Sequence, residues 1–234
     1  MRPYKLYVFL NSFQLDKTRR EALKRELRKD GRVALWVYAP GYLDDRPSLE
    51  LMRDLTGFSF GVSETRWGPL MHSLDPHHPI TAGVPQDLSW GTNSKLSPIF
   101  YLNDPEARLL GQLVFSQGNC KPGMGIKAFP EWTSIYVAAP NLPGALLRGI
   151  ARFSGTHLYN EAGDVLYASR ELLGVHTVYG GERTFSLPRE VEVVYDLFER
   201  RTVARNTAEF QVNLPRASTA LYYTGDAALP SKLK

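Results

Sequence analysis

The chain has 234 residues, 43% of them hydrophobic and 12% aromatic, which is enough to bury the core of one large or two modest globular domains. Much of its net charge of +4 comes from residues 16–31, where basic side chains alternate with acidic ones around an apolar stripe, so the charge indicates a solvated helix face and excludes a nucleic-acid surface. Because no run is apolar enough for a membrane span or a signal peptide, and the single cysteine excludes an internal disulfide, we expect a cytoplasmic protein that binds neither membrane nor nucleic acid.

The first part of the chain alternates strand-like and helix-like segments. Residues 4–11 and 33–40 are apolar runs, and an amphipathic helix is predicted between them over 16–29. This order is typical of a βαβ unit in a mostly parallel sheet. After it we expect a helix at 46–58, an irregular stretch at 58–96, strands at 97–103, 123–129 and 133–140, and a helix at 142–155. We therefore predict an α/β domain with a flavodoxin-like sheet over residues 1–155.

The pattern changes after Gly155. Short apolar runs follow one another about every ten residues, separated by Gly, Pro, Asn or Asp, as in an antiparallel β-sandwich. Alternation is clearest in "VEVVYDLF" and "AEFQVNL". We predict a β-sandwich over residues 156–226 and a flexible tail over 227–234, where no periodicity is present.

Cys120 lies in the glycine-rich segment "SQGNCKPGMG". An activated cysteine needs a base or a helix N-terminus beside it, and a nucleophile elbow needs a helix after its strand. Here a turn follows, then another strand, and no histidine is near in the sequence. We interpret Cys120 as the tip of a hairpin and not as a catalytic thiol.

The histidines do not form a metal-binding pattern. His77 and His78 are adjacent and precede a proline, so they cannot share a helix face as a pair spaced four residues apart would. His72 and Asp75 are near in sequence, but a proline-flanked loop with polar caps explains them as well. We predict no metal site and no cofactor.

Eight segments in order resemble the C-terminal part of large beta-galactosidase-like glycoside hydrolases. They are "YKLYVFLN", "VALWVYAPGYLDD", "HHPITAGVP", "SPIFYLNDPEARLLG", "WTSIYVAAPNLPGALLRGIARFSGTHLYN", "GDVLYAS", "GVHTVYGGERTFSLP" and "VVYDLFERRTV". The resemblance implies a class I glutamine amidotransferase-like α/β domain, which is the trimerisation domain of those enzymes, followed by a small β-sandwich. Nothing in these residues corresponds to a catalytic barrel, so no catalytic residue is carried over.

The resemblance also bears on partners. In those hydrolases a further strand and helix precede the segment similar to "YKLYVFLN", so we expect either a longer polypeptide or completion of the sheet by another chain. The run is apolar enough for an inner strand, and an uncovered strand edge favours pairing with a partner. We therefore expect a homo-oligomer or a missing catalytic or N-terminal segment, unless a later strand covers this edge.

Any ligand site of an α/β domain is expected in the crevice at the carboxyl ends of the parallel strands. The crevice candidates are Asn11 and Ser12 after the first strand, Tyr42 and Asp44 after the second, and Asn141 after the third. Asp44 and Asp45 precede Pro47 and Ser48 and are most simply explained as helix N-terminal caps. Trp67 and Trp90, which we place in loops with Trp132, provide faces for stacking on a sugar or for packing over the sheet.

These observations lead to one main hypothesis and two alternatives. The main hypothesis is a non-catalytic accessory or oligomerisation module of a beta-galactosidase-like glycoside hydrolase, acting in carbohydrate metabolism. The alternatives are a free-standing hydrolase that uses the crevice and a carbohydrate-binding protein that uses Trp67 or Trp90. A polar pocket at the strand ends favours a free-standing enzyme, whereas a crevice filled by aromatic side chains disfavours it.

Overall fold

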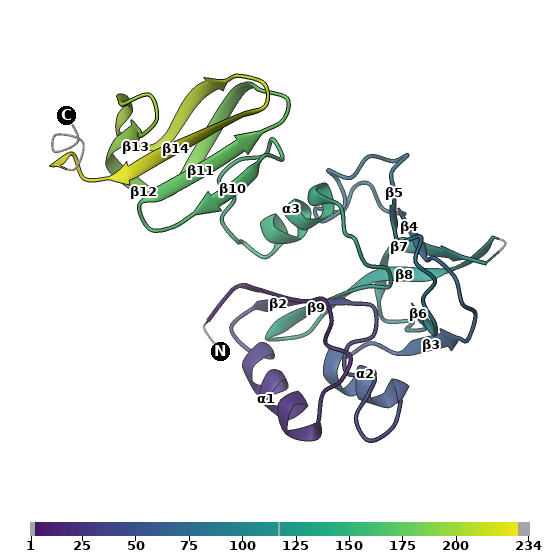
Figure 1. Cartoon of the computed structure of the whole chain (residues 1–234). Helices are drawn as coiled ribbons and strands as arrows, with labels where there is room; N and C mark the ends of the chain where they lie inside the picture. Colours follow the sequence, from purple (N-terminus) through teal and green to yellow (C-terminus); the bar gives the residue numbers. More distant parts are fainter. Residues whose placement is uncertain (1–2, 117, 229–234) are drawn as a thin grey trace. The chain divides into compact units, whose positions relative to one another are not determined.

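The computed structural model describes residues 3–116 and 118–228 and divides the chain into two compact units, residues 1–156 and 157–234 (Figure 1). In the first unit, seven described strands form one sheet in the order β1-β2-β9-β8-β7-β4-β5. They are β1 (Leu6–Phe9), β2 (Arg32–Val37), β4 (Leu70–Ser73), β5 (Ser89–Gly91), β7 (Arg108–Phe115), β8 (Asn119–Ala128) and β9 (Trp132–Val137). Two more strands, β3 (Phe60–Ser63) and β6 (Ile99–Leu102), pair with each other in a separate antiparallel sheet.

The prediction of a mostly parallel, flavodoxin-like or glutamine amidotransferase-like α/β sheet is wrong. Only β1, β2 and β9 run parallel to one another, and β8, β7, β4 and β5 are each antiparallel to their neighbours. Parallel neighbours need a crossover of a dozen or more residues. Residues 129–131 are all that separate β8 from β9, which makes this pair a hairpin. The described part of the chain holds three helices against fourteen strands, so the protein is mostly β.

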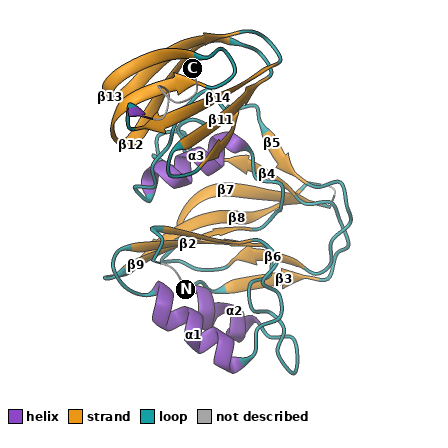
Figure 2. Ribbon diagram, turned by 60° about the vertical axis from the view of Figure 1, so that its left-hand side comes forward, coloured by secondary structure: helices purple, strands orange, loops and turns teal. Residues whose placement is uncertain are grey.

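The three helices lie where the sequence predicts them, with tighter ends. They are α1 (Lys17–Leu27), α2 (Leu49–Thr56) and α3 (Gly144–Phe153), with α1 and α2 on one side of the sheet and α3 on the other (Figure 2). Asp16 caps α1 by accepting a hydrogen bond from the Arg19 N–H, and Ser48 caps α2. Gly57, with φ +81°, ends α2. None of the described helices has the length and apolar character needed to cross a membrane.

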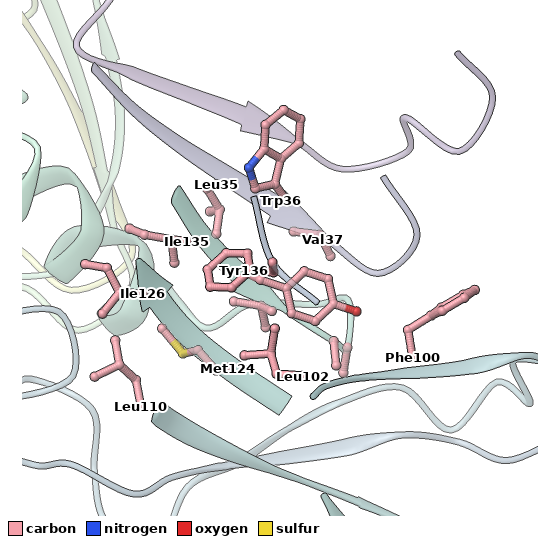
Figure 3. Packing of buried hydrophobic residues seen from close by; sticks show 14 of the residues in the cluster. Leu35, Trp36, Val37, Phe100, Leu102, Leu110, Met124, Ile126, Ile135 and Tyr136 are labelled. Atoms are coloured by element: carbon pink, nitrogen blue, oxygen red, sulfur yellow. The ribbon is translucent and has the colours of Figure 1, made fainter. Parts of the chain in front are cut away.

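The core of the first unit is centred on β2, all of whose residues are buried. Trp36 is fully buried, and its indole N–H donates to the Ser134 hydroxyl of β9 at 3.0 Å. That hydroxyl donates in turn to the Thr56 carbonyl at the end of α2, 2.7 Å away. Figure 3 shows the packing around Trp36 and Tyr136. These hydrogen bonds fix α2 over β2 and β9 and leave neither the Trp36 N–H nor the Ser134 hydroxyl unpaired.

The second unit is one continuous antiparallel sheet that bends over itself, where the sequence predicts a small antiparallel sandwich. Its order is β10-β11-β14-β12-β13, formed by β10 (Val165–Ala168), β11 (Leu172–Thr177), β12 (Gly181–Asp196), β13 (Arg201–Leu214) and β14 (Ser218–Gly225). Each of the two long strands begins well before the run that the sequence predicts there, "VEVVYDLF" for β12 and "AEFQVNL" for β13. The last residues of the predicted tail, 229–234, lie outside the described residues.

The long β12–β13 hairpin folds back over its own sheet. Tyr222 of β14 pairs with Asp196 of β12. In a straight strand, Asp196 and Phe185 would be roughly 36 Å apart, because eleven residues separate them. The Phe185 ring nevertheless lies 6.2 Å from the Tyr222 ring, centroid to centroid. Register shifts between Ser186 and Val191 provide the bend. One bent hairpin therefore supplies the second layer that encloses this core.

Candidate functional site

Aromatic side chains fill the crevice at the carboxyl ends of β1, β2 and β9. The Tyr38 ring meets Phe13 edge-on at 5.7 Å and Phe100 at 5.4 Å, and Tyr42 lies 4.7 Å from Phe100. The Tyr38 hydroxyl donates to the Pro98 carbonyl at 2.7 Å. These contacts occupy the place where an open parallel sheet holds a ligand.

The buried phenol of Tyr136 and the half-buried phenol of Tyr38 carry no charge near neutral pH. Tyr136 donates its hydroxyl to the Tyr38 carbonyl at 2.7 Å. Burial raises the pKa of Tyr136 well above its ordinary value, and burial likewise raises the pKa of Tyr38. Both hydroxyls act as structural donors, and neither is suited to act as a base.

The polar candidates at the strand ends serve the fold. Asp44 forms an ion pair with Arg20, and the carboxylate lies 2.8 Å from the guanidinium. Arg20 is only 5% exposed. The Ser12 carbonyl accepts from the Gly41 N–H at 2.7 Å. Asn11 is exposed on the same loop. The expectation that Asp44 caps a helix is wrong, because Ser48 holds that position and Asp44 neutralises a buried arginine instead.

Asn141 has a similar structural role at the end of β9. Its backbone adopts a left-handed conformation, with φ +60°, which asparagine tolerates better than most residues. Its side-chain amide donates to the Gly91 carbonyl at 2.9 Å. This bond ties the loop after β9 to β5, so Asn141 lies apart from the aromatic cluster and fixes the far edge of the sheet.

The three tryptophans that the sequence places in loops divide into two buried rings and one exposed ring. Trp90 lies in β5 opposite Met71, and Trp132 lies in β9 stacked on Phe129 at 4.7 Å. Both are 5% exposed, so the packing interpretation is confirmed for them. Trp67 is 42% exposed and is the ring of the three that offers a face to solvent.

The remaining sequence candidates are explained by local structure. Cys120 is exposed in β8, opposite Val114 at the end of the β7–β8 hairpin, so the hairpin interpretation is confirmed. His78 is buried and accepts a hydrogen bond from the Ile80 N–H, and burial lowers the pKa of its imidazole. Asp75 forms an ion pair with Arg108 at 2.7 Å. Within residues 3–116 and 118–228, no three His, Cys, Asp or Glu side chains gather as metal ligands would.

The structure shows an open groove of about 980 Å³ between β1 and α1, which the sequence analysis missed. Its lining combines a largely apolar floor with a charged rim. The floor is formed by Phe9, Leu15, Ala22 and Leu23 with the polar Ser12, and the rim by Arg19, Arg25, Glu26 and Lys29. The apolar stripe of α1 is wider than the surface that the sheet covers, since Leu27 is buried while Leu23 is half-buried and Ala22 is exposed. The spacing of these residues predicts the apolar stripe, but it does not predict how much of the stripe the sheet covers.

The groove lies beside a sheet edge. Among the described strands, β1 stands at the end of the sheet order and has β2 as its neighbour. The Lys5 carbonyl accepts from the Val33 N–H of β2 at 2.8 Å. Because backbone groups alternate along a strand in a parallel ladder, the N–H and C=O groups of Leu6 and Val8 point away from β2. The Val8 side chain is 43% exposed.

Comparisons with solved structures identify proteins that share this fold. No protein-family model matches the sequence, and a search of curated protein sequences finds no significant match. The chain superimposes on a beta-galactosidase from Bacillus circulans sp. alkalophilus with TM-score 0.64 and 15% identity, over 95% of this chain and 33% of that one. A beta-galactosidase from Rahnella sp. R3 gives TM-score 0.61 and 12% identity, over 94% and 32%.

A third example, a GH42 beta-galactosidase from G. stearothermophilus, gives TM-score 0.59 and 13% identity over 94% of this chain and 32% of that one. The chain therefore spans about a third of the length of these enzymes. At such identities the comparison establishes a shared fold, which covers both units.

Proposed function

We propose that this chain is a non-catalytic accessory module of a beta-galactosidase-like glycoside hydrolase. The observation that carries the proposal is the extent of the structural match, which takes in nearly all of this chain and only a third of each beta-galactosidase. A module that corresponds to a third of an enzyme works beside the remaining parts and not in place of them. The partner we propose is accordingly a polypeptide that carries the catalytic residues.

The filled crevice supports this proposal over a free-standing hydrolase. Glycoside hydrolysis by the usual routes needs two carboxyl groups about 5 to 9.5 Å apart across a sugar-binding cleft. The acidic candidate near the crevice, Asp44, is committed to Arg20, and the surrounding volume holds Tyr38, Tyr42 and Phe100. A carboxylate that neutralises a buried guanidinium cannot leave it without a large penalty.

An assay of the purified chain with a nitrophenyl galactoside tests the proposal. We expect no hydrolysis above the rate of the buffer blank, with the Asp44→Asn variant indistinguishable from wild type. Turnover that disappears on changing one acidic residue contradicts the proposal, because it demonstrates a catalytic carboxylate in this chain. A second check is to read the coding sequence upstream of Met1 and the adjacent genes. We expect one of them to encode a catalytic barrel.

The exposed Trp67 favours a second candidate function, carbohydrate binding. An indole face that is 42% exposed is suited to stacking on a sugar ring. Titration with galactose and galactobiose, followed by tryptophan fluorescence, tests it. A saturable change that is absent in Trp67→Ala supports sugar binding, and an unchanged spectrum excludes it for these two sugars.

A further inference from the structure

We propose that the β1 edge and the adjoining groove bind an extended, acidic segment of a partner polypeptide, which adds a strand to the sheet beside β1. The proposal rests on the backbone geometry of β1, the apolar floor of the groove and the charge of its rim. It concerns an interaction surface and holds whether or not the partner is a glycoside hydrolase.

The backbone of β1 provides the register for an added strand. The outward N–H and C=O groups of Leu6 and Val8 have no backbone partner among the described residues. Each such group pairs with water or with another strand, and an extended peptide satisfies the whole row at once. A small molecule of the same volume does not repeat this spacing. The edge therefore favours a peptide ligand.

The groove provides room for the side chains of that strand. Phe9 lies on the α1 side of the sheet, where its ring stacks on Trp36 at 4.3 Å, and it forms part of the groove wall. Alternate side chains of a strand added to β1 point toward the same side as Phe9. They fall over Leu15 and Leu23, which are half-buried. On the other face, the alternate side chains meet the exposed Val8.

The charge of the groove rim favours a bound segment with acidic residues on either side of its apolar centre. Three cations and one carboxylate, Glu26, line the rim. Glu26 is engaged by the buried Arg32 and by Lys29, whereas Arg25 forms no ion pair within the described part of the chain. Among the described residues, Arg19 pairs only with the exposed Asp16, at 3.5 Å. The uncompensated charge of the rim is positive, so a segment with Glu or Asp beside its apolar residues is complementary to it.

The same charges disfavour a second copy of this chain as the occupant. A two-fold axis perpendicular to the sheet places β1 antiparallel to the partner copy's β1 and brings both α1 helices to the same face. The basic rims of the two copies, which include Arg19 and Arg25, then lie on the same face beside each other. Like charges across an interface cost several kcal/mol, and this edge carries few acidic groups to offset them. The occupant is therefore a segment of different sequence.

A labelled peptide tests the proposal on the full chain. Its centre alternates valine with threonine, which favour strands, and both ends carry glutamates; a control peptide carries lysines instead. By fluorescence anisotropy we expect saturable binding of the acidic peptide and at least tenfold weaker binding of the lysine peptide. Arg25→Glu should weaken binding of the acidic peptide by about tenfold. The matched control is Lys17→Glu, which makes the same charge change on α1 outside the groove and should leave binding unchanged.

Two further variants test the geometry. Val8→Pro removes an outward N–H and no ladder bond, so the edge strand tolerates it and the peptide should no longer bind. Ala22→Trp fills the groove from the helix side and should block binding even if Val8→Pro impairs folding. No binding of either peptide, equal binding of both, or full binding to a folded Val8→Pro each overturns the proposal. A wild-type dimer in sedimentation equilibrium that becomes monomeric in Val8→Pro also overturns it, because a second copy then occupies the edge.

Discussion

Gly149 of α3 lies so close to the chain at Ile80 that no side chain fits between them. A Cβ atom on Gly149 would lie 2.0 Å from the Ile80 carbonyl oxygen, which is backbone and cannot rotate away. In contrast, a Cβ on Gly144, at the start of the same helix, would meet only the mobile end of Arg148 at 3.3 Å. The two glycines therefore differ in the cost of one added methyl group.

We predict that Gly149→Ala lowers the free energy of unfolding by about 3 kcal/mol, although alanine gains about 1 kcal/mol over glycine in helix propensity. Gly144→Ala, the matched control, should change it by less than about 0.5 kcal/mol. Urea unfolding followed by tryptophan fluorescence measures both. A Gly149→Ala variant as stable as wild type contradicts the close approach of α3 to Ile80.

A second prediction concerns the buried Arg20. Asp44→Asn keeps the shape of the side chain and removes the charge that neutralises Arg20, which is 5% exposed. We expect a loss of about 2 kcal/mol of stability, below the full cost for a buried pair because the Asp44 side chain is 26% exposed. Asp45→Asn, at an exposed position, should be neutral. If the two variants behave alike in urea unfolding, the ion pair contributes nothing.

At the scale of elements, Asp104 joins three separate strands. Its carboxylate follows β6 and accepts hydrogen bonds from the Ser59 N–H before β3 at 2.9 Å and from the Glu106 N–H at 3.0 Å. It also pairs with Lys127 of β8 at 3.2 Å. Burial alone would raise the pKa of Asp104, but these donors outweigh it and hold the pKa below its usual value of 3.8.

This lowered pKa predicts a dependence of stability on pH. A carboxyl group with a depressed pKa in the folded state stabilises the fold fully above its unfolded pKa of about 4, and the contribution disappears as pH falls through the folded value. Asp104→Asn should therefore cost about 2 kcal/mol at pH 7, and the difference from wild type should shrink below about pH 4. Glu106→Gln, whose side chain is 75% exposed, serves as the control. A difference that grows in acid contradicts the assignment.

Elements with strong local signals were predictable, and their pairing was not. The helix at 16–29 is found as α1 and the alternating run "AEFQVNL" is found within β13, because capping and alternation are local properties. The parallel sheet was a wrong extrapolation from the first βαβ unit. β7 and the short strands β3, β4 and β5 were missed, and with them the antiparallel half of the sheet, whose pairing depends on contacts distant in sequence.

The candidate site shows the same limit. Tyr42 was placed at the strand ends from the sequence, yet its contact with Phe100 was not foreseen because Phe100 comes from β6, far away in sequence. The role of Asp44 depends on Arg20, a charge that looks like any other on the basic face of α1. Local patterns identify which residues are polar, whereas burial and partners decide whether a polar residue is free to act.

At the scale of the whole molecule, each unit has its own hydrophobic core. The buried cluster of the first unit and that of the second share no residue. All four tryptophans, Trp36, Trp67, Trp90 and Trp132, belong to the first unit. Tryptophan fluorescence therefore reports on one unit, while far-UV circular dichroism reports on the strands of both.

This separation of probes leads to the last prediction. Phe185 is fully buried in the second unit and stacks on Phe210 at 5.2 Å. Phe185→Ala should cost that unit about 3 to 5 kcal/mol through the cavity it leaves. In urea unfolding, we expect part of the circular dichroism change to occur at lower urea concentration. The transition followed by tryptophan fluorescence should keep its midpoint. Tyr179→Ala, at a position that is 85% exposed in the same unit, should move neither. A tryptophan transition that shifts together with the circular dichroism shows that the two units unfold as one cooperative structure, because destabilisation of one core then reaches the other.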